Sequence, residues 1–465
     1  MTDFAALLQP DRAQTARRIH LLDAASTEEW LKTRPASDRA LAEAQRFDGK
    51  SEGALLILPR DGGEFEVALA VKDRSALSPW CLAGAADRLP AGSYRPAEGS
   101  VGPATLGWLL AQHRFDQYKS KPSPDRGARV LLTGEAARID EAVRLAEATA
   151  MVRDLVDTPA GDLGPAELEG AVRAWAREVG AEVTVTSGED LERGYPMVAA
   201  VGAAAVPGRA PRMIEASWGN PAHPRIAVIG KGVCFDSGGL DLKPASGMRL
   251  MKKDMGGAAH ALALARLIAG ARLPVRLHLL IPAVENAVAG GAFRPGDILR
   301  SKAGTRVEID NTDAEGRLIL GDALTRAGEE QPELIVDFAT LTGAARVALG
   351  PDLPALFVND DSLAEQLLAA SREASDPLWR MPLWDGYDDM LKSDIADMVN
   401  SADSSFAGSV TAALFLRRFV PEGTAWAHLD TFAWRPVAKP GRPKGGEALG
   451  LRAVYAALAG RFPVP

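Results

Sequence analysis

The sequence predicts an α/β protein with a small N-terminal α/β domain, a long connecting helix, and a larger C-terminal α/β domain whose mixed, mostly parallel sheet is covered by helices. Two observations predict this fold class. In the C-terminal two thirds, short apolar runs alternate with stretches of helical periodicity, which is the rhythm of βαβ units. The chain also has 465 residues, 47% of them hydrophobic, enough for one large core or two domains. We place the domains at residues 1–135 and 158–465, with the connecting helix at 136–157.

The N-terminal third carries the pattern of a small α/β domain. The apolar runs at 54–58 and 66–70 predict strands, and the stretch 107–111 predicts a helix. Proline, glycine, serine and charged residues cluster at 119–127, as expected of a linker or an exposed loop. From 136 to 156 apolar residues recur at helical spacing, and this pattern ends before a Thr-Pro pair, where proline favours an extended residue.

Strands and helices then alternate through the larger domain. In folds of this kind ligands bind at the carboxyl ends of the strands, so residues that follow a predicted strand are candidates for a ligand site. The predicted strands are 226–229, 275–281, 306–309 and 334–338, and the predicted helices are 255–268 and 318–327.

Composition narrows the class of protein. A net charge of −8 and a pI of about 5.5 disfavour a protein built mainly to bind nucleic acid or an anionic membrane. Only two cysteines are present, Cys81 and Cys234, which excludes a disulfide framework and fits a reducing compartment. The N-terminus lacks the pattern of a signal peptide and no apolar run reaches membrane-spanning length, so we expect a cytoplasmic protein with no membrane partner.

The segment Asn311–Leu318, Asn-Thr-Asp-Ala-Glu-Gly-Arg-Leu, carries the strongest chemical signal. It places the carboxylates of Asp313 and Glu315 and the guanidinium of Arg317 at alternate positions. A turn with this spacing can direct several oxygens at one divalent cation, with a fixed positive charge beside it. The same residue types also build ordinary turns, and Thr312 or Asp313 could simply cap a following helix.

A second group of polar residues follows the strand at 226–229. Lys231 and Asp236 lie in a glycine-rich loop, which is neither a GxxxxGK[ST] phosphate loop nor a dinucleotide fingerprint, because Phe235 stands where a third glycine is required. Lys243 follows this loop, and Asp254 opens the next helix. Asp254 could act as a plain N-cap.

The four carboxylates described above, those of Asp236, Asp254, Asp313 and Glu315, either lie apart in the fold or share bound cations. Four of them converging without cations would repel one another and raise their pKa values. Ion pairing with Lys231, Lys243 and Arg317 is one alternative, and bound metal is the other. No histidine pair has zinc-ligand spacing, and we expect His260 and His278 to be packed residues. The favoured interpretation is a carboxylate-rich site for two divalent ions, which could be zinc, manganese, magnesium or cobalt.

The two polar segments described above resemble the signature segments of a known protein family. The loop Gly230–Gly239 and the segment Asn311–Leu318 are similar to the signatures of the leucyl aminopeptidases, the M17 family of dinuclear metallo-aminopeptidases. The resemblance covers residues 155–465, whereas in the N-terminal third it is limited to Arg114–Ser120. Further similarity runs through residues 251–259, 294–297, 339–344, 393–398 and 426–430. The loop Ser401–Phe406 departs from the glycine- and arginine-rich loop of relatives.

The resemblance implies a role for each polar residue. Asp236 and Glu315 would bridge two metal ions, Lys231 and Asp254 would complete the tighter site, and Asp313 would complete the more exchangeable one. Lys243 and Arg317 would be the catalytic cations, and Arg317 would hold a bicarbonate ion that serves as general base. Thr340, Leu341 and Gly343 would line the substrate cleft, and Met251 would line an apolar side-chain pocket or be an ordinary core methionine.

The implied reaction is release of the N-terminal residue of a peptide, preferably leucine or another bulky apolar residue. Two ions (manganese or zinc) would bind the free amine and share the water that attacks the carbonyl, while Lys243 donates to the developing oxyanion. The family also implies a homohexamer. Two alternatives stay open at this stage: a different dinuclear metallohydrolase such as a phosphoesterase, and an additional DNA-binding regulatory role, which the acidic net charge disfavours.

Overall fold

The computed structural model describes residues 2–464, which form two compact units. One unit extends to Ala150 and includes Val437–Lys444, and the other comprises Met151–Pro436 and the chain from Gly445 onward. The division falls inside helix α5 (Ile139–Asp157). The domain boundaries given above, at residues 135 and 157, stay a prediction. Among the described helices, none is both long and apolar enough to cross a membrane.

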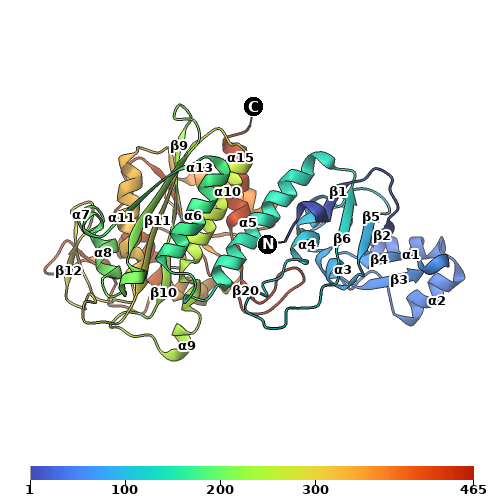
Figure 1. Cartoon of the computed structure of the whole chain (residues 1–465), viewed down its shortest axis with the longest axis horizontal. Coiled ribbons are helices and arrows are strands. Elements are labelled where there is room, and N and C mark those ends of the chain that lie inside the picture. The colour runs from blue at the N-terminus through green and yellow to red at the C-terminus, as the bar shows by residue number, and fades with distance from the viewer. Residues whose placement is uncertain (1, 465) are drawn as a thin grey trace. The chain divides into compact units, whose positions relative to one another are not determined.

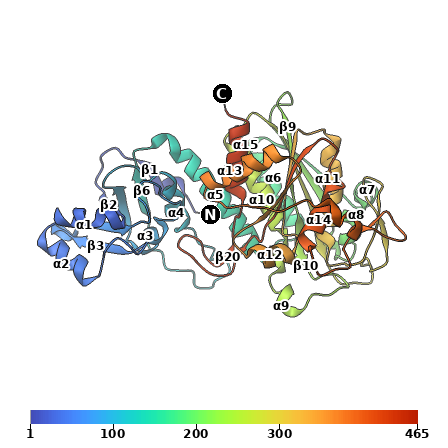
Figure 2. The ribbon, with the colours of Figure 1, turned by 180° about the vertical axis from the view of Figure 1, so that it is seen from behind.

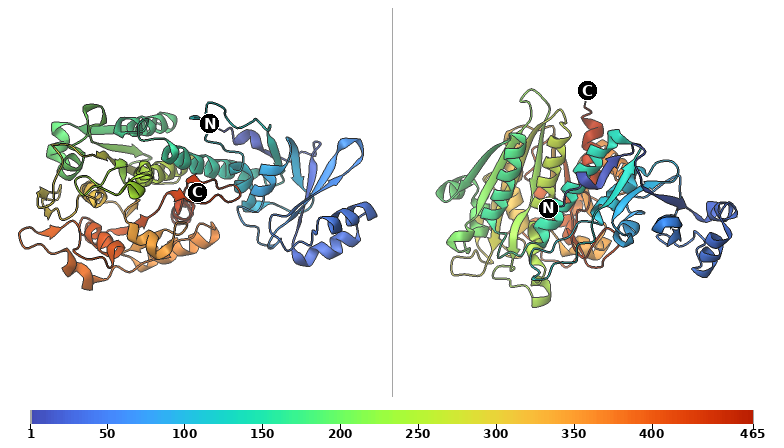
Figure 3. Two further views of the ribbon diagram at one scale, coloured as in Figure 1. Left: turned by 90° about the horizontal axis from the view of Figure 1, so that it is seen from below. Right: turned by 45° about the vertical axis from the view of Figure 1, so that its right-hand side comes forward.

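The first unit contains a six-stranded sheet with strand order β1-β6-β5-β2-β4-β3. Its neighbouring strands are parallel except for the antiparallel pair of β3 and β4. These strands, blue to cyan, form one twisted sheet in Figure 3. Their bounds are β1 Leu8–Pro10, β2 Arg17–Leu22, β3 Leu55–Pro59, β4 Phe65–Ala70, β5 Gly92–Pro96 and β6 Arg129–Thr133.

Strand alternation gives this sheet two apolar faces. Ala68 and Ala70 of β4 pack with helices α1 and α2, whereas Val67 and Leu69 face α3, α4 and the start of α5. Both faces are therefore covered, as expected of a mostly parallel sheet. The helices are α1 Ala24–Lys32, α2 Ala36–Ala44, α3 Ala83–Arg88 and α4 Thr105–Leu110.

The second unit is built on a nine-stranded sheet with order β16-β15-β18-β14-β9-β11-β8-β7, in which β10 also pairs with β11. The central strands β18, β14, β9, β11 and β10 run parallel, and the antiparallel pairs lie toward the edges. The bounds are β7 Glu182–Ser187, β8 Arg212–Trp218, β9 Arg225–Gly230, β10 Gly232–Asp236, β11 Arg276–Asn286, β14 Leu334–Ala339, β15 Ala355–Val358, β16 Trp379–Arg380 and β18 Ala425–Asp430.

Helices cover both faces of this sheet. Ala227 and Ile229 of β9 pack with α8, α11 and α14, whereas α10 contacts β9 from the other side, toward which Ile226 and Val228 alternate. Figure 1 shows α6 and α10 in front of β9 and β11, and Figure 2 shows α11 and α14 from behind. The helices are α6 Pro165–Val179, α7 Glu189–Gly194, α8 Pro196–Gly202, α9 Ala245–Met248, α10 Gly256–Gly270, α11 Glu315–Glu329, α12 Gly343–Leu349, α13 Asp361–Glu373, α14 Gly408–Arg417 and α15 Leu451–Arg461.

The predicted elements are confirmed with one correction of placement. The apolar runs became β3, β4, β9, β11 and β14, and the helical stretches became α4, α5, α10 and α11. The strand expected at 306–309 exists as β13 (Arg306–Glu308). It does not join the main sheet, however, but lies between β12 (Ile298–Arg300) and β17 (Met398–Val399) in a separate small sheet. Three residues are too few to reveal their partner strand from sequence.

A buried ion pair joins two central strands of the second unit. His428 Nδ1 lies 2.5 Å from Asp337 Oδ1, and Trp426 Nε1 donates to Asp337 Oδ2 at 2.7 Å. Burial lowers the pKa of His428, but the carboxylate of Asp337 outweighs it and raises that pKa above its ordinary value of 6.5. This pair therefore adds stability below pH 6.5, and the contribution is lost as the pH rises through the raised pKa.

We expect Asp337→Ala to lower the free energy of unfolding by about 3–5 kcal/mol, because it leaves a buried cation and an indole N–H without an acceptor. The difference from the native chain should be largest at pH 6 and smaller at pH 9. Urea denaturation at both pH values measures it. Asp394→Ala, at an exposed aspartate, is the matched control, and equal losses of stability at the two pH values would contradict the pairing.

Candidate metal centre and active site

Polar residues gather at one edge of the main sheet, where the parallel strands end. Lys231 follows β9, Asp236 ends β10, Asn286 ends β11, Thr340 follows β14 and Asp430 ends β18. All five are buried. Because these strands run parallel, their carboxyl ends meet at one edge, as the sequence predicted for a ligand site in this fold.

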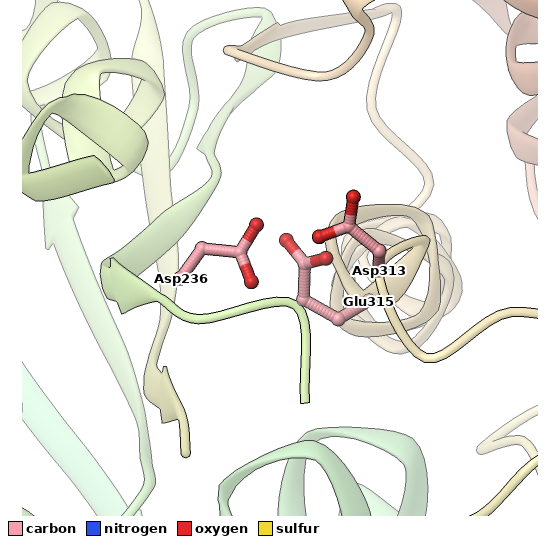
Figure 4. A group of neighbouring side chains, drawn as sticks. All are labelled: Asp236, Asp313 and Glu315. Atoms are coloured by element: carbon pink, nitrogen blue, oxygen red, sulfur yellow. The ribbon is translucent and has the colours of Figure 1, made fainter. Parts of the chain in front are cut away.

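Three carboxylates converge at this edge. Asp236, Asp313 and Glu315 each offer an oxygen, and these oxygens lie within 4.8 Å of one another. Figure 4 shows the side chains directed toward one another, with Glu315 at the start of α11 and Asp313 in the turn before it. Glu315 is fully buried, whereas Asp313 is partly exposed. Hard oxygen ligands this close together suit a divalent cation.

Lys231 lies between two of the carboxylates. Its Nζ is 2.7 Å from Asp254 Oδ2 and 2.8 Å from Glu315 Oε1. The lysine fits there because residue 316 is glycine: a Cβ at Gly316 would meet Lys231 Cε at 2.5 Å. Thr340 Oγ1 donates to Asp254 Oδ1 at 2.8 Å and fixes that carboxylate from the other side.

Lys243 pairs with the remaining carboxylates. Its Nζ lies 2.8 Å from Asp236 Oδ2 and also pairs with Asp313 Oδ1. The other oxygen of Asp236 accepts hydrogen bonds from Asn286 Nδ2 and from the backbone N–H of Gly238, each at 2.9 Å. Asp236 is thus held in place by residues outside the set that the sequence singled out, Asn286 above all.

The charges of the site are strongly coupled. Burial and the neighbouring Asp236 raise the pKa of Glu315 to about 8 and that of Asp313 to about 6. Burial lowers the pKa of both Lys231 and Lys243, but the adjacent carboxylates outweigh it and raise both values, so both lysines carry a charge at neutral pH. With all four carboxylates ionised, they would exceed these two lysines by two negative charges, and the raised pKa values of Glu315 and Asp313 reflect the cost of that excess.

The donor set fits bound divalent cations. Both oxygens of Glu315, Oδ2 of Asp254 and Oδ1 of Asp313 are buried without a well-aligned hydrogen-bond donor. Leaving such atoms unsatisfied is costly in a protein interior. The ion pairs with lysine meet part of this demand, as the ion-pairing alternative requires. The excess negative charge and the oxygens without donors still call for further positive charge.

Arg317 lies beside the cluster in the first turn of α11. Its Nη1 donates to the backbone oxygen of Asn400 at 2.7 Å, while its Nε is buried without an acceptor. Burial lowers the pKa of Arg317 to about 10, so the guanidinium stays charged at neutral pH. The Asn400 side chain also binds Asn311 and Ala314 and so fixes the loop that precedes α11.

A cavity of about 390 Å³ opens over the cluster. Every residue singled out from the sequence lines this cavity except Glu315, which lies buried beneath it. The lining set includes Lys231, Asp236, Lys243, Met251, Asp254, Asp313, Arg317, Thr340, Leu341 and Gly343. Lys253, Arg346 and Phe432 also line the cavity, and the sequence did not indicate them as site residues.

Simpler explanations of these residues do not match the structure. Helix α11 has Ala314 at its N-cap and α10 has Met255, and neither cap forms a side-chain hydrogen bond, so Thr312, Asp313 and Asp254 are not helix caps. His260 Nδ1 lies 2.7 Å from the Gly256 oxygen, and His278 pairs with Glu215 at 2.9 Å. Both histidines are packed residues away from the cluster, as predicted.

Comparisons with known proteins agree with this geometry. Residues 150–455 match the model of the "Cytosol aminopeptidase family, catalytic domain", and residues 18–132 match the "M17 aminopeptidase, N-terminal domain". A probable cytosol aminopeptidase of Syntrophotalea carbinolica is 43% identical over 365 residues, which cover 74% of this chain and 72% of the relative.

Solved structures resemble the chain over nearly its whole length. Cytosol aminopeptidase from Coxiella burnetii matches with a TM-score of 0.93 and 43% identity, over 98% of this chain and 99% of that one. The bottromycin maturation enzyme BotP in complex with Mn matches with a TM-score of 0.85 and 33% identity, covering 96% and 100%. A tomato leucine aminopeptidase mutant matches with a TM-score of 0.83 and 27% identity, covering 97% and 95%.

Fold, site and relatives together define the class, a metallo-exopeptidase of the leucyl aminopeptidase type that acts on peptides. More particularly, the chain belongs to the M17 cytosol aminopeptidase family.

Proposed function

We propose that this protein is a dinuclear-metal aminopeptidase that removes leucine and other bulky apolar residues from the N-terminus of peptides. The observation that carries the proposal is the convergence of the Asp236, Asp313 and Glu315 oxygens within 4.8 Å beneath a cavity. Two divalent ions per subunit, manganese or zinc, would complete it. The manganese complex of the relative BotP supports this part.

In this proposal Asp236 and Glu315 would be ligands shared by the two ions. Lys231 and Asp254 would hold one ion, and Asp313 would hold the more exchangeable one. Bound there, the ions would supply Lewis-acid polarisation and lower the pKa of coordinated water. Lys231 is charged among its carboxylates, so it must lose a proton to become a ligand, which a nearby dication favours.

Two cations of the chain act on the substrate. Lys243 remains protonated and donates to the carbonyl oxygen as it becomes an oxyanion. Arg317 would hold bicarbonate, and its buried Nε without an acceptor supports an anion at that position. Leu341 offers its backbone oxygen to the substrate, and Thr340, Gly343 and Met251 line the pocket for the N-terminal side chain.

The test is hydrolysis of leucine p-nitroanilide before and after chelation, with manganese or zinc restored afterwards. We expect activity to be lost on chelation and regained with metal. Activity that survives removal of metal, or absent activity with every metal tried, would refute the proposal. A phosphate ester is assayed in parallel, and its failure to be hydrolysed would exclude a dinuclear phosphoesterase.

Arg317→Lys is expected to lower kcat/KM about tenfold to a hundredfold, because an ammonium cannot provide the planar bidentate grip of a guanidinium. The variant should also lose stimulation by added bicarbonate, which steady-state assays in bicarbonate-free buffer measure. Arg372→Lys, at an exposed arginine of α13, is the control. Near-normal turnover by Arg317→Lys would show that the guanidinium is not needed.

A homohexamer and a cytoplasmic location belong to the same proposal. The curated relatives are named cytosol aminopeptidases, which supports the location. Light scattering of the purified chain measures the mass of the assembly, and a monomeric mass would exclude the hexamer.

A further inference from the structure

Arg346 is a cation in the cavity that the proposed mechanism does not use. It lies in α12, and its Cζ is 4.7 Å from the ring centroid of Phe432. Its Nη2 is 3.7 Å from the position that a Cβ on Gly343 would occupy. Arg346 is exposed to solvent, but it lines the cavity together with Phe432 and Gly343, so its guanidinium lies at the cavity rim.

Within residues 2–464, Arg346 forms no ion pair or hydrogen bond through its side chain, unlike Lys231 and Lys243, which are each held by two carboxylates. A second cation lies on the same ring: Lys253 Nζ is 5.4 Å from the Phe432 centroid, with Asp254 Oδ1 at 3.6 Å. Lys253 is thus paired with Asp254, whereas Arg346 brings to this wall a positive charge that no carboxylate of residues 2–464 pairs with.

The contact with Phe432 orients the guanidinium without using its donors. Stacking on an aromatic ring engages the face of the guanidinium, and its in-plane N–H groups remain for an acceptor. Carboxylates match that planar fork bidentately. Apart from the bicarbonate assigned to Arg317, an acceptor that enters the cavity would be a group of the substrate.

We propose that Arg346 binds a substrate carboxylate, and that this carboxylate is the side chain of an acidic N-terminal residue. The inference rests on the proposed function and extends its substrate class: the enzyme releases glutamate and aspartate as well as apolar residues. Gly343 and Met251, assigned to the pocket for the first side chain, line the same cavity as Phe432 and favour that source. The methylene groups of glutamate would pack on Phe432 and Met251, and its carboxylate would meet Arg346.

The experiment compares p-nitroanilides of glutamate, glutamine and leucine with the metal-loaded native enzyme, Arg346→Gln and Arg346→Lys. Glutamate and glutamine differ by one charge at equal size. Because Arg346 is exposed and solvent weakens its pairing, we expect Arg346→Gln to lower the glutamate-to-glutamine ratio of kcat/KM by only about five- to tenfold. Arg346→Lys should keep part of the ratio, and added salt should reduce the native ratio. Arg372→Gln is the matched control and should change nothing.

A second arm compares Leu-Ala with Leu-Ala amide to detect a carboxylate on the leaving residue. A loss confined to Leu-Ala in Arg346→Gln would keep the arginine as a carboxylate binder but overturn its assignment to the first side chain. An unchanged ratio in both arms overturns the inference, while leucine anilide activity still supports the proposed function. Absent leucine anilide activity in the native enzyme defeats the proposed function itself.

Discussion

Glu315→Gln is expected to reduce kcat/KM by on the order of a thousandfold, which corresponds to several kcal/mol of transition-state stabilisation. Glu315 is the most buried of the converging carboxylates, and both its oxygens lack a well-aligned donor. A glutamine keeps the size of the side chain but supplies one neutral oxygen where a bridge needs two charged ones. The effect should therefore arise from metal binding rather than from packing.

Metal content and thermal unfolding separate these causes. Addition of manganese should raise the Tm of the native protein, because a ligand that binds only the folded state stabilises it by about 2.7 kcal/mol at a hundredfold excess over Kd. Glu315→Gln should lose most of that gain and retain less metal after dialysis. Glu333→Gln, at an exposed glutamate of the same unit, should behave like the native protein. A Glu315→Gln variant with native metal-dependent stabilisation would remove Glu315 from the ligand set.

The parts of the site that could be predicted from sequence are those fixed by short-range rules. Apolar runs located β9 and β14, and the carboxyl ends of parallel strands share one edge of a sheet, so residues after both strands were expected at that edge. The pairing of β9 with β14, which brings Lys231 and Thr340 close together, came from the structure. The spacing of Asp313, Glu315 and Arg317 predicted one turn that directs them to a common point; in the structure α11 already begins at Glu315, so only Asp313 lies in the turn. These inferences needed no knowledge of loop paths.

What sequence did not indicate depends on contacts between distant loops. Asn400 binds the backbone of the loop before α11 across more than eighty residues, and nothing in its own neighbourhood signals this. Phe432 and Arg346 meet only because the turn after β18 lies beside α12. Asn286 lies at the end of β11, but the strand predicted from sequence ended at residue 281, so the strand-end rule did not point to it.

The segment Val437–Lys444 illustrates the same limit at the level of domains. It belongs to the first compact unit although the chain on either side belongs to the second. Arg442 Cζ lies 4.4 Å from the ring centroid of Trp80, a contact between residues far apart in sequence. Its prolines, glycine and lysines mark a loop. Composition cannot say which core such a loop packs on.

Lys243→Met is expected to lower kcat about a hundredfold to a thousandfold with little change in KM, because it removes a donor that acts on charge developed in the transition state. Lys243 is the most suitable donor on two grounds. Its Nζ lies beside the Asp236 and Asp313 carboxylates, and those carboxylates raise its pKa, so the ammonium remains protonated through the neutral range. Methionine preserves most of the length and the apolar stem of the side chain.

The metal content of the variant distinguishes a donor to the oxyanion from a metal ligand. Lys243→Met should bind manganese at least as well as the native protein, because it removes a positive charge that competes for the Asp236 and Asp313 oxygens. Glu315→Gln should instead lose both metal and activity. Lys392→Met, whose side chain is 72% exposed, controls for the loss of one lysine. If Lys243→Met lost metal in proportion to activity, Lys243 would be a metal ligand rather than the donor to the oxyanion. Lys231 and Lys243 would then have to exchange the roles assigned to them.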